Sequence, residues 1–159
     1  MRSEKFVYFS YAVLMSRGQM KQLCPRARPI GRAVLHGYKL CFPRVSGVWM
    51  GGIPSLRKSK NEDVWGVLWE GDNLCLEQMD KYQGFRGPDG ENVFERRPVE
   101  VDDGEGHVLQ AQAYFAPDAE VNRNSYLPSA ELVDTLVRAA QDFKLPPEYV
   151  TKLERLAPN

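Results

Sequence analysis

The stretch formed by residues 6–11 places the strongest constraint on how this chain folds, because β-branched and aromatic residues dominate it. Such residues favour an extended backbone, and a dense apolar run of this length suits a strand inside a sheet rather than at its edge. We therefore expect a central strand close to the N-terminus.

Further segments of the same extended character recur along the chain, separated by residues that favour turns. They are residues 34–42, with an interruption near Gly37, 49–56, 64–69, 93–101 and 108–115. The polar stretch 58–63 predicts a turn between two separate strands.

Short helices are predicted between these strands. Ser16 and Gln19 have the spacing of a capping box, and Pro25 ends the helix that they begin. Asp72 is suited to cap a helix that Gly84 terminates.

Two more helices are expected at the C-terminal end, beginning after Ser129 and at Pro147. About six strands with short helices between them, and no regular alternation of strand and long helix, favour an α+β fold with a mostly closed sheet. Residues 1–159 contain no repeat, low-complexity tract or linker, so one domain is expected.

The composition excludes several classes of function. Lys plus Arg equals Asp plus Glu at 21 each, which disfavours a nucleic-acid or membrane-surface partner. No apolar run approaches the roughly 18–20 residues that cross a bilayer, and no signal peptide is apparent. Cys24, Cys41 and Cys75 lack metal-ligand spacing and are odd in number, which favours three structural thiols and a cytoplasmic location.

Several motifs resemble the γ-glutamylcyclotransferase (AIG2-like) family, in the family's order and over nearly the whole chain. They are the aromatic strand at 8–11, the glycine-containing strand at 51–56, the Val-Trp-Gly-Val strand within 63–69 and the Leu-Pro-Pro-Glu-Tyr sequence at 145–149. The resemblance implies a small mixed β-barrel with flanking short helices and a cavity opened by the first loop.

The family's reaction is an attack of an amino acid's α-amine on its own γ-carbonyl, which expels an amine and forms 5-oxoproline. It needs hydrogen-bond donors for the substrate carboxylate and amide, a carboxylate that moves protons, and aromatic walls that fold the substrate. The resemblance implies no metal and no cofactor.

This chain departs from the family pattern at the positions that carry the chemistry. Gln83 occupies the position of the family's catalytic Glu. An amide cannot accept a proton near pH 7. Other departures, in the first loop and the pocket wall, are at Ala12, Val13, Leu14, Phe94 and Leu132.

The candidate ligand-binding residues are Tyr11, Ala12, Val13, Leu14, Gly51, Gly52 and Tyr114, with Gln83 at the catalytic position. Two interpretations stay open for each. Gln83 either recognises a ligand or is a passive remnant, the residues of the first loop either line an apolar pocket or fill an unused one, and the tyrosines either bind a ligand or pack in the core.

The sequence therefore predicts a diverged family member that binds a small amino-acid, amide or acyl ligand and has lost the standard cyclisation. The alternatives are an enzyme with altered amide or acyl chemistry and a residual γ-glutamyl cyclotransferase, so enzymatic activity is left open. The expected partner is a small molecule, with neither nucleic acid nor membrane, and the expected state is a monomer or homodimer.

Overall fold

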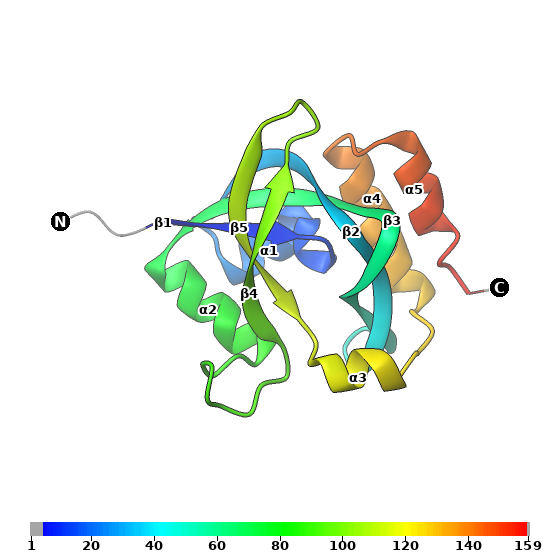
Figure 1. Ribbon diagram of the computed structural model, residues 1–159, viewed down its shortest axis with the longest axis horizontal. Coiled ribbons are helices and arrows are strands. Elements are labelled where there is room, and N and C mark those ends of the chain that lie inside the picture. Colours follow the sequence, from blue (N-terminus) through cyan, green and yellow to red (C-terminus); the bar gives the residue numbers. More distant parts are fainter. Residues whose placement is uncertain (1–4, 159) are drawn as a thin grey trace.

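The computed structural model, which describes residues 5–158, contains a closed five-stranded barrel with the strand order β1-β3-β2-β4-β5 (Figure 1). β1 pairs antiparallel with β3 and parallel with β5, where Tyr8 lies opposite Gln112, and this last pairing closes the barrel. The strands are β1 (Lys5–Ser10), β2 (Arg28–Ser46), β3 (Gly51–Asp72), β4 (Glu95–Asp102) and β5 (Val108–Phe115).

β1 is the central strand that the sequence predicts, and its side chains alternate between two cores. Phe9 is fully buried inside the barrel with Leu68, Val101 and their neighbours. Tyr8 points the other way, into a second core between the barrel and the helices. Because successive side chains of a strand face opposite sides, burial on both sides explains why the segment is almost entirely apolar.

The expected turn at residues 58–63 is wrong, because this stretch lies within the single long strand β3. Tyr38 of β2 pairs with Lys58 of β3, and His36 of β2 pairs with Asp63 of β3. The residues of β3 between Lys58 and Asp63 have no partner on β2, so they bulge out of the ladder. A bulge accommodates extra polar residues without ending the sheet. The two strands expected on either side are therefore one strand, and the barrel has five strands rather than about six.

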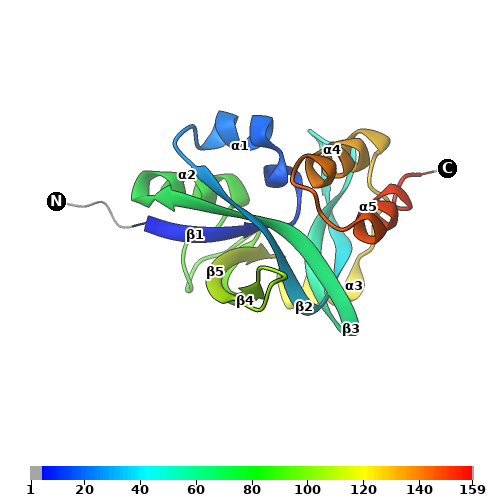
Figure 2. The same ribbon diagram turned by 90° about the horizontal axis from the view of Figure 1, so that it is seen from above.

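Five α-helices and one 3-10 turn accompany the barrel in the described part of the chain. They are η1 (Val13–Met15), α1 (Arg17–Leu23), α2 (Asn73–Gln83), α3 (Asp118–Arg123), α4 (Ala130–Asp142) and α5 (Pro147–Glu154). Figure 2 shows α1 and α4 on the same side of the barrel strands. None of the helices in residues 5–158 is both long and apolar enough to cross a bilayer.

The predicted helix ends are confirmed. Ser16, Asp72 and Ser129 each accept a hydrogen bond from a backbone amide in the first turn of the helix that they cap. Gly84 ends α2 in the left-handed conformation, at φ 73°. α3 and η1 are not anticipated by the sequence pattern.

The second core lies where α4 and α5 cover the barrel. Leu132, Leu136 and Ala140 lie on one face of α4 and are fully buried in the same core as Tyr8, Trp69 and their neighbours. This arrangement fixes the start of α4 beside the end of β1, and the cavity described next lies between them.

Candidate functional site

A small cavity of about 60 Å³ opens where the chain leaves β1. Its walls come from the end of β1, the first loop, the start of β3, the end of α2, and single residues before β4, in β5 and in α4. The lining residues are Tyr8, Tyr11, Ala12, Val13, Trp49, Ile53, Pro54, Tyr82, Gln83, Phe94, Tyr114 and Leu132.

The first loop forms the 3-10 turn η1, closed by hydrogen bonds from Met15 N to Ala12 O (2.9 Å) and from Ser16 N to Val13 O (3.0 Å). Ala12 and Val13 line the cavity. Leu14 does not line it, and its side chain is buried in the core between barrel and helices. This wall of the cavity is therefore apolar.

Gln83 reaches the cavity because α2 ends there. The left-handed Gly84 turns the chain back, and Phe94 N donates to Gln83 O at 3.1 Å, so both side chains line the same space. The Gln83 side chain is half-buried. Tyr82, which precedes it, also lines the cavity although sequence reasoning missed it; its only signal was adjacency to Gln83.

Tyr114 of β5 is held by a polar contact behind the cavity wall. Its hydroxyl donates to Asp80 Oδ1 at 2.6 Å, and Arg96 lies 3.4 Å from the other carboxylate oxygen of Asp80. Burial, together with the hydrogen bond to Asp80, raises the pKa of Tyr114 far above its usual range. Tyr114 is therefore a neutral hydrogen-bond donor.

Tyr8 in β1 and Tyr11 just after the end of β1 complete the inner wall of the cavity. Tyr11 donates to the carbonyl oxygen of Tyr114 at 2.5 Å, and the rings of Tyr8 and Tyr114 meet edge to face at 5.7 Å. Burial raises the pKa of both Tyr8 and Tyr11 well above the usual range. These phenols are uncharged at neutral pH.

Gly51 and Gly52 are not among the lining residues, although the sequence predicts them as ligand-binding. They support the chain that leads into α4. Gly52 N donates to Leu127 O at 2.8 Å, and a Cβ atom on Gly51 would lie 2.8 Å from Ser129 N. The flanking residues Trp49 and Ile53 line the cavity instead.

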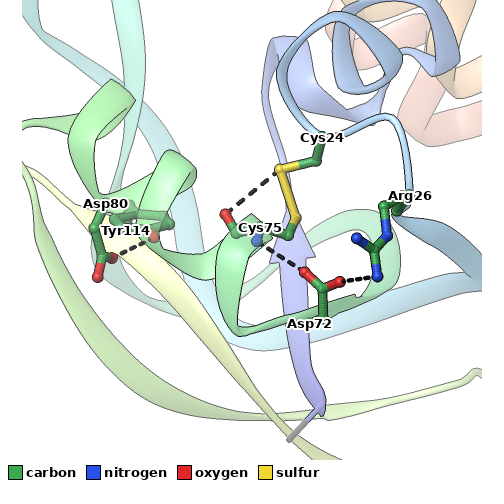
Figure 3. Close-up of a disulfide and its surroundings, with 6 residues drawn as sticks. All are labelled: Cys24, Arg26, Asp72, Cys75, Asp80 and Tyr114. Atoms are coloured by element: carbon green, nitrogen blue, oxygen red, sulfur yellow. Dashed lines mark hydrogen bonds and ion pairs between the residues drawn. A yellow bond between two sulfur atoms is a disulfide. The ribbon is translucent and has the colours of Figure 1, made fainter. Parts of the chain in front are cut away.

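Cys24 and Cys75 form a disulfide, which corrects the prediction of three structural thiols (Figure 3). Their Cα atoms are 5.4 Å apart, and the bond joins the end of α1 to the first turn of α2. Asp72 accepts a hydrogen bond from Cys75 N at 3.0 Å and pairs with Arg26 at 2.9 Å (Figure 3). The same helix α2 ends at Gln83, so the disulfide anchors the element that carries the candidate catalytic position.

One group of possible metal ligands, Asp103, Glu105 and His107, lies on the exposed hairpin between β4 and β5. Asp103 accepts hydrogen bonds from the backbone amides of Glu105 and His107. These hydrogen bonds stabilise the turn and explain why the three residues lie close together. None of the three lines the cavity.

Comparisons with known proteins agree with the barrel fold. The family model described as Gamma-glutamyl cyclotransferase, AIG2-like, matches residues 8–133. Gamma-glutamylcyclotransferases of Bos taurus and Homo sapiens are each 28% identical to this chain over 160 residues, which covers 98% of it and 81% of the relative. A solved structure named Gamma-glutamyl cyclotransferase superposes with a TM-score of 0.87 at 28% identity, covering 98% of this chain and 90% of the other.

Proposed function

Because this chain belongs to the γ-glutamyl cyclotransferase family, we propose that it binds a small amino-acid, amide or acyl ligand in the cavity and has lost the 5-oxoproline-forming cyclisation. The observation that carries this proposal is the position of Gln83 in the cavity wall, where the family resemblance implies a catalytic Glu. General acid–base catalysis is typically worth roughly 10²–10⁴-fold in rate.

The surroundings of Gln83 offer no obvious replacement base. Among the described residues that line the cavity, none is a carboxylate. Asp80, three positions earlier on α2, is the nearest candidate in sequence. Its carboxylate already contacts the Tyr114 hydroxyl and Arg96.

The first loop supports the same conclusion. The family's loop presents polar side chains to the substrate, whereas Ala12 and Val13 present only alkyl groups here. A substrate carboxylate at this wall would lose hydration without gaining side-chain hydrogen bonds, which costs free energy. The absence of the base and the absence of polar loop side chains therefore both support the proposed loss of the cyclisation.

The test is release of 5-oxoproline from γ-glutamyl peptides and amines, with a bovine relative as the positive control. We expect no release above the background without protein. Gln83→Glu alone is also expected to remain inactive, because the loop side chains are unchanged. Rapid turnover by the unaltered protein would contradict the proposal.

A second candidate, an enzyme with residual or altered amide chemistry, is favoured by one contact. Tyr114 lines the cavity and its hydroxyl donates a hydrogen bond to Asp80, so a proton could pass between a ligand that reaches this hydroxyl and the carboxylate. In that case Asp80→Asn would abolish turnover of the amide substrate, and Gln83→Leu would leave part of it. Slow turnover that is unchanged by Asp80→Asn would exclude the relay.

A further inference from the structure

The cavity wall carries no formal charge. Among its lining residues in the described chain there is neither an acid nor a base, and Gln83 provides the only carboxamide. Burial raises the pKa of Tyr8, Tyr11 and Tyr114, so these tyrosines remain protonated over the physiological range. A charged ligand group placed here would have no side-chain counterion, and an unpaired buried charge is costly.

The nearest charges linked to the wall compensate one another. Asp80 is bonded to the Tyr114 hydroxyl, and Arg96 stands 3.4 Å from Asp80. Arg96 also lies over the ring of Phe85 at 5.3 Å, which holds it against the loop after α2. This pair therefore leaves little net charge behind the wall to attract an ammonium or a carboxylate.

Aromatic side chains supply half of the lining residues: Tyr8, Tyr11, Trp49, Tyr82, Phe94 and Tyr114. They differ in depth. Tyr8 and Tyr114 are only 3% and 2% exposed, whereas Tyr82 is 51% exposed and Trp49 is half-buried. Tyr82, and in part Trp49, are therefore the aromatic lining residues that a ligand can reach from solvent. Accessible aromatic rings at a cavity suit a flat apolar group.

Gln83 lies in the same wall and offers one hydrogen-bond acceptor and two donors. A ligand carboxamide can exchange two hydrogen bonds with it, donor to acceptor in both directions. A carboxylate ligand can only accept, and an ammonium can only donate, so each leaves part of the Gln83 amide unpaired.

The geometry points to an uncharged amide as the ligand of this cavity, with its carboxamide against Gln83 and an aromatic or other apolar group against Trp49 and Tyr82. Zwitterionic amino acids are correspondingly disfavoured. This inference rests on the proposed ligand-binding function and narrows it from amino acids, amides and acyl compounds to one chemical class.

The test is titration calorimetry of the full chain with three matched probes. Hydrocinnamamide carries an uncharged amide and a ring, hydrocinnamate has the same shape with a carboxylate, and L-glutamine has the amide with a zwitterion and no ring. We expect hydrocinnamamide to bind at least roughly tenfold tighter than either other probe. Equal or tighter binding of hydrocinnamate or L-glutamine, or no binding of hydrocinnamamide at its solubility limit, would overturn the inference.

Variants assign the selectivity to named side chains. Tyr82→Ala and Trp49→Ala are each expected to weaken hydrocinnamamide binding by roughly tenfold. Tyr126→Ala, which removes a similarly exposed tyrosine outside the lining, should leave it unchanged. Gln83→Leu should reduce the preference for hydrocinnamamide over hydrocinnamate. Melting temperatures without ligand establish that each variant is folded, and Trp49→Phe replaces Trp49→Ala if the latter is not.

Failure of this inference and failure of the proposed function give different results. Tight binding of L-glutamine or a γ-glutamyl compound without 5-oxoproline release would reject the uncharged-amide ligand and leave the proposed function standing. Release of 5-oxoproline would reject the proposed loss of cyclisation, whatever the affinity for hydrocinnamamide.

Discussion

The Tyr114 hydroxyl donates a 2.6 Å hydrogen bond to Asp80 Oδ1, and this single contact ties β5 to the last turns of α2. The barrel and the helix that carries Gln83 are thereby joined directly behind the cavity wall. Residues 34 positions apart in the chain meet here, so the site depends on the closure of the barrel as well as on the residues that line it.

Removing this contact should loosen the end of α2. Tyr114→Phe leaves the partly buried Asp80 without its hydroxyl donor, so we expect the free energy of unfolding to fall by about 1–3 kcal/mol. Urea denaturation measures the loss. Tyr126→Phe is the control, since this residue is exposed. Equal stability of the two variants would show that the Tyr114 contact contributes nothing.

The Cys24–Cys75 disulfide should stabilise the fold and the position of α2. It closes a loop of 51 residues, for which chain entropy gives about 4 kcal/mol. Denaturation of the oxidised protein with and without a dithiol reductant should show a large difference. The double variant Cys24→Ser with Cys75→Ser should show none.

Cys41 provides the matched control for the disulfide. It is the free cysteine of the described chain, and burial raises the pKa of its thiol to about 11. Cys41→Ser should therefore keep the full response to reductant. Titration of three free thiols in the denatured, non-reduced protein would contradict the bond.

His36 should make stability depend on pH. Its Nδ1 lies 2.8 Å from Asp63 and its Nε2 lies 2.6 Å from Asp102, and these hydrogen bonds raise the pKa of His36. The stabilisation is complete below the unfolded-state pKa of about 6.5 and is lost as pH rises through the higher folded-state pKa. Because the ring is largely exposed, we expect less than about 1 kcal/mol.

Asp102 should make the stability depend on pH in the opposite direction, with a loss as the pH falls. The hydrogen bond from His36 lowers the pKa of Asp102, so its contribution is present above the ordinary range of Asp and is lost on acidification. Urea midpoints measured from about pH 3 to 9 should fall for the unaltered protein both in the acid range, where Asp102 is protonated, and above neutrality, where His36 loses its proton, and should stay flatter for His36→Gln. Parallel curves for the two proteins would exclude this role.

Gly52 should tolerate no side chain. A Cβ atom there would lie 2.5 Å from Tyr126 O, against backbone that cannot move alone. Gly52→Ala is expected to cost about 1–3 kcal/mol of stability by overpacking. Gly47→Ala, where a Cβ meets nothing within 4 Å, is the control and should be nearly neutral. Thermal denaturation of both variants compares them directly.

Local patterns predicted the helices well because the information that ends a helix is local. Ser16, Asp72 and Ser129 bond to amides within the next turn, and Gly84 adopts a conformation that few other residues accept. The strand at residues 58–63 was mispredicted for the opposite reason. Its ends, Lys58 and Asp63, both pair with β2, and this pairing keeps the stretch within one strand although the residues between them bulge out. No local pattern contains that neighbour.

The candidate site was predicted in part. The sequence named Tyr11, Ala12, Val13, Gln83 and Tyr114, and the fold brings these five together around one cavity. It also named Phe94 and Leu132 as departures in the pocket, and both line the cavity. It missed five lining residues, namely Tyr8, Trp49, Ile53, Pro54 and Tyr82.

The sequence alone determined the first strand, the helix ends that it predicted and the family, because alternation, capping and motif order are properties of short segments. Tertiary structure decided which residues share a space. Leu14 and Val13 are neighbours in the chain and are both buried in the same core, yet only Val13 also lines the cavity. Cys24 and Cys75 are distant in the chain, yet they are bonded, because barrel closure sets α1 against α2. Such proximity depends on the packing of segments far apart in the chain, and no single segment encodes it.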